Sequence, residues 1–443
     1  MEQFRLPVNV EYILTKLHDN GYEAYIVGGC VRDKLLSREP HDYDITTSAL
    51  PQQVEEVFKD EKIIETGIKH GTVTLLLDNQ PYEITTYRNE GNYSDHRHPD
   101  QVSFSATLKE DVERRDFTIN GMAYNHQEGL VDLVKGQEDL SNGIIRCIGD
   151  PDERFNEDAL RILRAIRFAS RFNFQIEEKT NQAIFNNKDL LKFVSSERIL
   201  TELKEIITSV NADTYLDQYR EVLAVFLPEL TEMFDFQQCN HHHNLDLWHH
   251  SLLTVRNVPQ DVNTRMAALF HDIGKPGAQF FDENGEAHYH GHQYISYDIT
   301  EEILKRLHMS NNDTKEILSL IKWHDYVLTS DYTIKKVLKE MPLETYNKLI
   351  ALKRADNMAK DYNYVLVNDD YYQRLLVLGE QLSREPLKVS DLNINGYDLL
   401  NLGYKGEEIG KILQDLSDRV IKGDLLNEHD VLVEYVERGK NDQ

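Results

Sequence analysis

Two aspartates separated by one residue, Asp42 and Asp44, are the first residues in the sequence with an obvious capacity for chemistry. On an extended strand alternate side chains point to the same face, so both carboxylates would lie together with Tyr43 opposite. Such a pair can hold two Mg²⁺ ions, one to activate an attacking hydroxyl and one to shield a leaving pyrophosphate. Glu83, in an expected strand at 82–87, is the candidate third carboxylate. An Asp-x-Asp pair is also common at solvated strand ends, so the assignment needs further support.

A pair of glycines, Gly28-Gly29, gives that support. It follows a short apolar strand, 24–27, and opens a helix. Glycines in this position let the backbone approach a phosphate, and the first amides of the helix point at the anion. Arg32 lies one helical turn further on and could meet the same phosphate.

A second group of chemistry-bearing residues begins near residue 240. His250, His271-Asp272 and Asp356 occur in the order His, His-Asp, Asp. Imidazoles and carboxylates together suit Mn²⁺, Ni²⁺, Zn²⁺ or Mg²⁺, so the metal stays open. His292 and His324 could complete a second metal position. A lone histidine is more often a hydrogen-bonded residue than a ligand, and only the ordered set favours a metal site.

The elements that position these residues change character along the chain. Residues 1–145 predict a mixed α/β region, with a helix at about 8–19 and strands at 24–27, 43–46, 72–77 and 82–87. Residues 89–101 are polar and rich in turn formers, which predicts a mobile loop. From about 153 onward the apolar residues recur every three or four positions, which predicts helices.

Composition limits the possible classes of protein. A chain of 443 residues suggests two to four domains, and we find no run of apolar residues long enough to span a membrane. The N-terminus lacks a signal-peptide pattern, and the three cysteines lie far apart, so we expect a cytoplasmic protein. The net charge of −27 is unusual for a partner of nucleic acid. Six arginines between Arg146 and Arg171 nevertheless predict a narrow basic strip.

A long block of residues, together with the motifs above, indicates the family of the protein. Arg114 to Ala123 reads RRDFTINGMA, and Asn156 to Arg161 reads NEDALR, followed by Arg164, Arg167 and Phe168. Together with the glycine pair and the Asp-x-Asp pair, this block resembles the class II tRNA nucleotidyltransferases, the bacterial-type CCA-adding enzymes and their A-adding, CC-adding and poly(A) polymerase relatives. The resemblance covers nearly the whole chain. Gly121 departs from it, because the family usually has alanine there.

The resemblance implies a polymerase-β-like head, with specific roles for individual residues. It places catalytic Mg²⁺ on Asp42 and Asp44, a triphosphate on Gly29 and Arg32, and the nucleotide on Arg115 and Asp116, with Asp116 contacting the ribose. It also makes Asp158 and Arg161 the residues that recognise the base, with Arg164 and Arg167 close by. The nucleotide-binding residues are then Gly28, Gly29, Arg32, Arg115, Asp116, Asp158, Arg161, Arg164 and Arg167.

Helical spacing gives a physical account of how such residues would select cytosine and adenine. Asp158, Arg161 and Arg164 lie three apart, which places them on one helix face. A carboxylate beside a guanidinium offers an acceptor and a donor that match the Watson–Crick edge of cytosine. A wrong base would leave buried groups unpaired, at a cost of roughly 1–3 kcal/mol each. The alternative is an ordinary salt-bridged helix surface.

Further segments resemble parts of the same proteins. Residues 88–99 resemble the family's flexible loop, which is needed for the final A and absent from CC-adding relatives. Residues 195–199 resemble its neck, and residues 393–399 and 403–413 resemble its C-terminal RNA-binding segment. The histidine segment resembles an HD-domain phosphohydrolase, whose expected role is repair of damaged tRNA ends.

These observations predict an α+β head of polymerase-β-like nucleotidyltransferase fold, followed by an all-α neck, HD body and tail. The expected domains are a head at 1–145, a neck with the base-selecting helix at 146–235, an HD metal-binding domain at 236–360 and a tRNA-binding tail at 361–443. The expected function is addition of CCA to tRNA 3′ ends from CTP and ATP. The alternatives are an A-adding enzyme, a poly(A) polymerase, an HD phosphohydrolase with a vestigial head, and a tRNA-binding module without chemistry. The intact head residues argue against the last two, and the sequence does not predict the oligomeric state.

Overall fold

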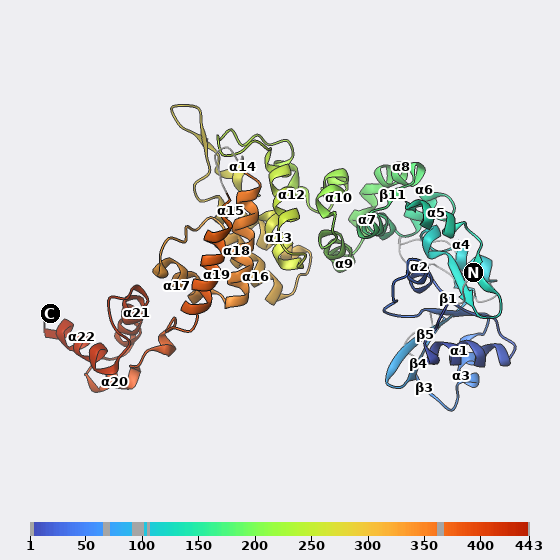
Figure 1. Ribbon diagram of the computed structural model, residues 1–443, viewed down its shortest axis with the longest axis horizontal. Coiled ribbons are helices and arrows are strands. Elements are labelled where there is room, and N and C mark those ends of the chain that lie inside the picture. The colour runs from blue at the N-terminus through green and yellow to red at the C-terminus, as the bar shows by residue number, and fades with distance from the viewer. Residues whose placement is uncertain (1–3, 65–70, 91–101, 104–106, 361–366, 442–443) are drawn as a thin grey trace. The chain divides into compact units, whose positions relative to one another are not determined.

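The computed structural model divides into two compact units, Met1–Pro228 and Glu229–Gln443. It describes residues 4–64, 71–90, 102–103, 107–360 and 367–441 (Figure 1). The first unit carries the sheet and the second is almost entirely helical. The finer division of the chain at residues 145 and 360 stays a prediction.

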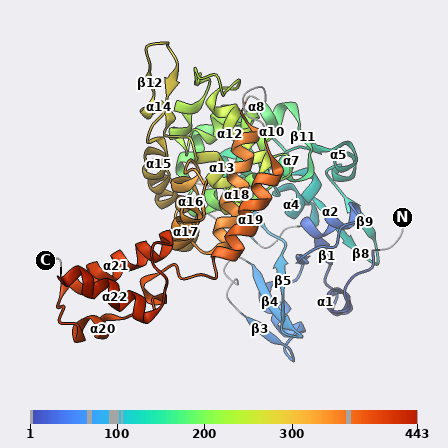
Figure 2. The same ribbon diagram turned by 60° about the vertical axis from the view of Figure 1, so that its left-hand side comes forward.

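The head is built on a mixed sheet of seven strands in the order β3-β4-β5-β2-β1-β8-β9 (Figures 1 and 2). All neighbouring strands are antiparallel except β2 and β5, which run parallel. The strands are β1 (Ala24–Val27), β2 (Ile45–Thr47), β3 (Lys62–Ile64), β4 (Thr72–Leu77), β5 (Gln80–Thr86), β8 (Met122–Asn125) and β9 (Gly129–Asp132). A separate two-stranded ribbon joins β6 (Asn89–Glu90) to β7 (Val102–Ser103).

Short helices complete the head. α1 (Val8–Asp19) buries Val10, Ile13, Leu14 and Leu17, the spacing of one face of a helix. It contacts β1 and α3 (Pro51–Val57). α2 (Gly29–Leu35) follows β1 directly, and α4 (Leu108–Glu113), the 3₁₀ turn η2 (Thr118–Asn120) and α5 (Gly136–Asn142) follow later.

Most sequence expectations for the head are confirmed. The helix at 8–19 and the strands at 24–27 and 72–77 match α1, β1 and β4. The strand expected at 43–46 begins two residues later, at Ile45, so Asp42 and Asp44 precede it. The backbone N–H of Val27 still donates to the carbonyl of Asp44 at 3.0 Å, which holds this segment beside β1.

The remainder of the first unit is a group of helices. Its elements are β10 (Ile144–Ile145), α6 (Pro151–Glu157), α7 (Leu160–Phe172), β11 (Gln175–Ile176), α8 (Glu178–Asn187), α9 (Ser196–Ile207), α10 (Ala212–Gln218) and α11 (Arg220–Leu223). α7 packs against α9. Asp150 caps α6 by accepting the N–H of Glu153, whereas Ser195 precedes α9 without a side-chain cap bond.

The second unit packs its helices around one another and adds a small hairpin (Figure 1). Its helices are α12 (Leu247–Asn257), α13 (Val262–Phe270), α14 (Lys275–Ala278), α15 (His292–Arg306), α16 (Asn311–Trp323), α17 (Asp331–Glu340), α18 (Leu343–Met358) and α19 (Asp369–Leu382). β12 (Phe280–Phe281) pairs with β13 (Ala287–His288). Pairwise contacts among α12, α13, α16 and α18 bring distant parts of the sequence together.

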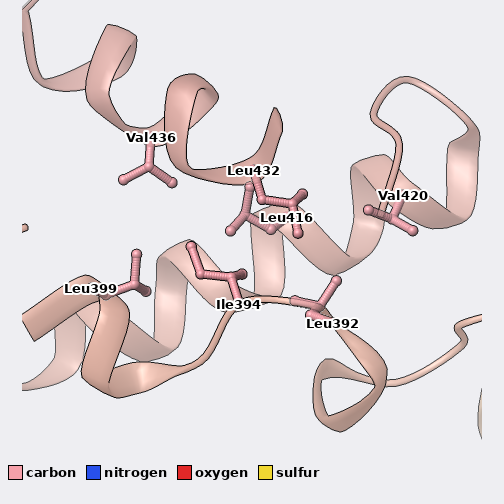
Figure 3. Close-up of a cluster of buried hydrophobic side chains, with 7 residues drawn as sticks. All are labelled: Leu392, Ile394, Leu399, Leu416, Val420, Leu432 and Val436. Carbon is pink, nitrogen blue, oxygen red and sulfur yellow. The ribbon is translucent and has the colours of Figure 1, made fainter. Parts of the chain in front are cut away.

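Three helices form the end of the chain around a small core of their own. These are α20 (Gly396–Asn401), α21 (Glu407–Lys422) and α22 (His429–Asn441). Figure 3 shows the core, whose buried members are Leu392, Ile394, Leu399, Leu416, Val420, Leu432 and Val436. The first turn of α21 carries Glu407 and Glu408, and these negative charges disfavour a phosphate at that helix start. RNA contact by this segment stays a prediction.

Two further sequence expectations concern a membrane span and the loop at 89–101. Within the described ranges, every helix is too short or too polar to span a bilayer. The mobile loop expected at 89–101 lies outside the described residues, apart from Asn89 and Glu90.

Candidate functional sites

The glycine turn, the Asp-x-Asp segment and an arginine from a later part of the head meet at one place. Gly28 has φ +75°, a conformation that favours glycine. A Cβ built on it would lie 3.2 Å from Nη1 of Arg115 and 4.0 Å from Oδ2 of Asp44. A side chain at this position would therefore crowd the guanidinium of Arg115, whereas the carboxylate of Asp44 lies at ordinary contact distance. The glycine keeps an open approach to a carboxylate and a guanidinium, the pair that a metal-bound phosphate requires.

The charges of the other two head carboxylates act on the pKa of Asp44. Partial desolvation and the charge of Asp42 raise the pKa of Asp44, Glu83 adds to the rise, and Arg115 opposes it. Glu83 lies on β5, opposite Thr74 of β4. Carboxylate oxygens are the ligands that Mg²⁺ prefers, so these residue types fit the expected ion. The charges of Asp42 and Glu83 reach Asp44, and a shared metal position for the three stays a prediction.

Arg32 is buried and held by neighbours on three sides. Its Nη1 donates to Oδ1 of Asn120 at 2.7 Å and its Nε donates to Asp33 at 2.9 Å. Its guanidinium also lies over the rings of Phe168 and Phe172, at 5.2 and 4.8 Å from their centroids. These contacts fix the guanidinium beside Gly29, whose Cβ position lies 3.5 Å from Nη2.

Asp116 forms the centre of a second buried network. Its Oδ1 accepts from Nδ2 of Asn120 at 3.1 Å, and its Oδ2 accepts from Nε and Nη2 of Arg164 at 2.8 and 2.6 Å. Burial alone would raise the pKa of Asp116, but Arg164 and Asn120 lower it to about 2. Asn120 therefore links Arg32 to Asp116 and ties the glycine turn to α7.

The aromatic ring of Phe168 joins three arginines. Besides Arg32, Arg164 and Arg167 lie over this ring at 5.5 and 4.2 Å from its centroid. Such cation–π contacts are each worth roughly 0.5–1 kcal/mol at exposed sites and more when desolvated. The ring thus organises the arginines at the start of the neck.

The basic strip expected between Arg146 and Arg171 is largely neutralised. Five of its six arginines form ion pairs with carboxylates, namely Arg146, Arg154, Arg161, Arg164 and Arg167. The strip is therefore a set of fixed, paired guanidinium groups rather than an open cationic surface.

The two residues expected to recognise the base do not pair with each other. Asp158 lies between α6 and α7, in extended backbone, so the expectation that it shares one helix face with Arg161 and Arg164 is wrong. Its Oδ2 accepts from Nη2 of Arg198 at 2.8 Å. Arg161 instead donates to Glu157 at 2.7 Å and to the carbonyls of Arg154 and Arg114. Each side chain is thus fixed separately at the junction of the two helices.

The second unit gathers the ordered histidines and aspartates into one buried cluster. Ligand atoms of His250, His271, Asp272 and Asp356 lie within 4.8 Å of one another. Nε2 of His250 lies 3.1 Å from Oδ1 of Asp356, and Nε2 of His271 lies 3.1 Å from Oδ2 of Asp272. Burial alone would lower the pKa of His271, but Asp272 and Asp356 raise it to about 9.

A second set of ligands shares Asp272 with the first. Oδ1 of Asp272 lies 3.1 Å from Nε2 of His292 and 3.5 Å from Nε2 of His324, and these three residues also gather within 4.8 Å. Oδ2 faces the first set, so the single carboxylate spans both positions.

Two further observations show that the cluster fits metal ions. Nδ1 of each of the four histidines faces a backbone carbonyl, which leaves Nε2 for the cluster. Among the described residues, Nε2 of His271 and Oδ2 of Asp272 are buried, and although they lie 3.1 Å apart they do not have the alignment of a hydrogen bond. Two lysines stand over the carboxylates, with Nζ of Lys275 2.7 Å from Asp272 and Nζ of Lys360 2.7 Å from Asp356. Both lysines line a cavity of about 320 Å³ that opens onto the cluster.

Four residues in these sites were not predicted from the sequence. Arg198 and Glu202 lie four apart on α9 and contact Asp158 and Arg167. Lys275 and Lys360 lie three and four residues after Asp272 and Asp356. Helical spacing from the predicted aspartates would have indicated the lysines, but the partners on α9 depend on tertiary packing.

Comparison with known proteins gives matches along most of the chain. Residues 24–146 match the poly A polymerase head domain. Residues 173–234 match a family described as "probable RNA and SrmB-binding site of polymerase A", and residues 293–436 match one described as "tRNA nucleotidyltransferase domain 2 putative".

Individual relatives extend this result. The CCA-adding enzyme of Ligilactobacillus salivarius is 32% identical over 440 residues, which cover 96% of this chain and 95% of that one. The CCA-adding enzyme of Lactobacillus helveticus is 56% identical over 190 residues, so the match spans 43% of this chain and about half of that relative, 47%. The crystal structure of the Bacillus stearothermophilus CCA-adding enzyme in complex with CTP covers 99% of both chains, with a TM-score of 0.73 and 26% identity.

The polymerase-β-like head and the helical regions that follow it define the chain as a nucleotidyltransferase. The likeness to the Ligilactobacillus salivarius enzyme goes further, because it extends over nearly the full length of both chains. The chain belongs to the family of CCA-adding enzymes, among the class II tRNA nucleotidyltransferases. Enzymes of this family use divalent metals, and the identity of the metals in this chain stays a prediction.

Proposed function

We propose that this protein adds CCA to tRNA 3′ ends from CTP and ATP. The observation that carries the proposal is the meeting of Gly28, Asp44 and Arg115 where β1 ends and β2 begins. Asp42, Asp44 and Glu83 would hold Mg²⁺ there, and the ions would supply activation of the terminal hydroxyl and stabilisation of pyrophosphate. Three free cysteines far apart in the chain favour the cytoplasm as the place of action.

The chain's own residues have distinct tasks in this proposal. Gly28 and Gly29 let the triphosphate approach the backbone, and Arg32 and Arg115 neutralise its charge. The ionised Asp116 contacts the ribose and is held in place by Arg164. Asp158 and Arg161 present one acceptor and one donor group to the base, each from a fixed position.

Transcripts of tRNA that end at the discriminator base, at C and at CC test this function. Each is incubated with CTP, ATP or both, and the products are separated on a sequencing gel. We expect the first transcript to gain C, C and A and then to stop. Extension of the CC-ended transcript alone, by one A, would instead show an A-adding enzyme that works with a CC-adding partner. Long A tails on unrelated RNA would show a poly(A) polymerase.

A double variant tests the metal-binding role of the aspartates. D42A/D44A is expected to lose incorporation of both nucleotides, whereas D60N, at an exposed aspartate of the same head, is expected to keep it. Incorporation by the double variant at the wild-type rate would refute the two-metal assignment.

A second function is favoured by the buried cluster of the second unit. We propose that residues 236–360 form an HD domain in which Asp272 bridges two divalent metal ions. His250, His271 and Asp356 would complete one position, and His292 and His324 the other. The metals would supply an activated water for hydrolysis of a phosphate ester, and Lys275 and Lys360 would attract the phosphate.

Metal content and hydrolysis are both measurable for this site. Elemental analysis after equilibration with Mn²⁺, Ni²⁺ or Zn²⁺ is expected to give two ions per wild-type chain at the cluster. D272N should lose both ions, because it removes the shared ligand. H249A, at a half-buried histidine of α12 that pairs with Asp246, is the matched control. Hydrolysis of a 2′,3′-cyclic phosphate should follow metal content, and equal hydrolysis by D272N would refute the proposed centre.

A further inference from the structure

Helix α9 makes two ion pairs to the region that is proposed to recognise the base. Nη2 of Arg198 lies 2.8 Å from Oδ2 of Asp158, and Oε2 of Glu202 lies 2.6 Å from Nε of Arg167. Arg198 and Glu202 are four residues apart, so both project from one face of α9. This face packs along α7. α9 contains none of the predicted nucleotide-binding residues, but it holds the side chains of two of them, Asp158 and Arg167.

The contact to Asp158 matters because of where this aspartate lies. Asp158 follows α6 and precedes α7, with φ −141° and ψ 102°, so neither helix restricts its side chain through regular packing. Its Oδ1 accepts the backbone N–H of Leu160 at 3.1 Å, and its Oδ2 accepts from Arg198. Two bonds on two different oxygens fix the plane of the carboxylate.

A fixed carboxylate can discriminate between bases. A carboxylate has about four lone-pair positions, so Asp158 keeps acceptor capacity after both bonds are made. Cytosine and adenine carry an exocyclic amino donor, N4 and N6. At the corresponding position guanine carries the carbonyl oxygen O6, and uracil, like thymine, carries O4. An acceptor held in one orientation bonds the amino group and repels the carbonyl. A carboxylate free to rotate would lose part of this selectivity, because it could turn away from the carbonyl.

We propose that Arg198 is a positioning residue for base selection, which acts by orienting Asp158 and has no contact with the nucleotide of its own. This proposal rests on the proposed function, in which Asp158 recognises the base. In this proposal α9 contributes part of the base selectivity that the sequence assigned to residues 158–167 alone. Glu202 holds Arg167 in the same way, so α9 fixes one side chain before α7 and one within it.

Single-nucleotide addition to a tRNA that lacks its CCA end tests the proposal. The values of kcat and KM for CTP and for UTP are measured for wild type, R198A, R198K and T201A, and CTP binding is measured separately by calorimetry. Thr201 lies on α9 and, within the part of the chain that the structure describes, its hydroxyl bonds only to the carbonyl of Glu197 in the same helix, so T201A is the matched control.

We expect R198A to lower the ratio of kcat/KM for CTP over UTP by about tenfold or more, as loss of one fixed hydrogen bond to a charged group implies. R198K should recover part of the ratio, because the contact of Arg198 to Asp158 uses a single nitrogen that an ammonium can replace. T201A should keep the wild-type ratio, and CTP should bind R198A more weakly.

Several results would overturn the proposal. If R198A lowers kcat/KM for CTP and UTP by the same factor, Arg198 has only a structural role. An unchanged ratio in both arginine variants would exclude any role in selection. If R198A does not fold, R198M replaces it, because methionine keeps the length of the side chain and cannot donate a hydrogen bond to Asp158. A CTP over UTP ratio in R198M equal to that of wild type, together with unchanged CTP binding, counts against the proposal. Failure of the proposed function would look different, because wild type itself would then not prefer CTP to UTP.

Discussion

At the scale of single residues, the head is dominated by charges that are buried in pairs. Asp116 and Arg164 form one such pair, and Asn120 ties Asp116 to Arg32. Removal of one partner from a buried pair is costly, because the other charge is left without compensation. These pairs place charged groups at the nucleotide site and also couple that site to the stability of the fold.

The pKa of Asp116 gives the first prediction. Its value of about 2 in the folded chain lies below the ordinary value of 3.8. Because its pKa is lowered in the folded chain, the ionised carboxylate of Asp116 stabilises the folded state above about pH 4. This stabilisation is lost as the pH falls toward 2. The D116N variant should therefore unfold more easily at pH 7, by about 2 kcal/mol.

Urea denaturation of wild type and D116N between pH 7 and pH 3 measures this difference. The gap between the two free energies of unfolding should narrow below pH 4. D60N, at an exposed aspartate of the same head, is the control and should show no such narrowing. A constant gap across the range would mean that Asp116 stabilises the fold through shape and not through its charge.

At the scale of elements, close helix crossings depend on glycine at particular positions. Gly379 of α19 lies against Tyr346 of α18, where a Cβ would come within 2.3 Å of the ring. The hydroxyl of Tyr346 also donates to the carbonyl of Leu375 at 3.1 Å. Gly410 of α21, by contrast, has open space around its Cβ position and lies inside a helix.

These two glycines predict opposite effects of the same substitution. G379A should lower the free energy of unfolding by about 1–3 kcal/mol, because the methyl group forces α18 and α19 apart. G410A should raise it by about 0.5–1 kcal/mol, since alanine loses less conformational entropy in a helix. Chemical denaturation of both variants checks the signs. Destabilisation by G410A would indicate that the α21 surface packs against a partner.

At the scale of the whole molecule, the division into two units has a thermodynamic consequence. Each unit has its own buried core and its own candidate ligand site. Two-state unfolding is usual for small single domains, and chains with several domains often depart from it. A ligand that binds only the folded state of one unit stabilises that unit, by about 2.7 kcal/mol at a hundred times its Kd.

Scanning calorimetry should therefore show two transitions that respond to different ligands. CTP with Mg²⁺ should raise the Tm of one transition, and Mn²⁺ at low concentration should raise the Tm of the other. D42A/D44A should lose only the first response, and D272N only the second. A single transition that responds to both ligands would show that the two units unfold together.

The sequence by itself determined the family of the protein and much of its local structure. The order of Gly28-Gly29, the Asp-x-Asp pair and the RRDFTINGMA block indicated the family through its resemblance to known nucleotidyltransferases, and the comparisons confirm that family. The helix at 8–19 and the strands at 24–27 and 72–77 followed from periodicity, which depends only on neighbouring residues. The ordered histidines and aspartates likewise indicated the buried cluster.

Only the tertiary structure decided which charged groups meet. The sequence paired Asp158 with Arg161 on the assumption of one continuous helix, whereas the chain breaks between α6 and α7 and Asp158 meets Arg198 of α9. The same holds for the link from Arg32 through Asn120 to Asp116, and for Asp272 between its two sets of histidines. Spacing along the chain gives the partners within one helix. Partners on different elements depend on packing directions, which are fixed only when the helices and the sheet bury their apolar faces together.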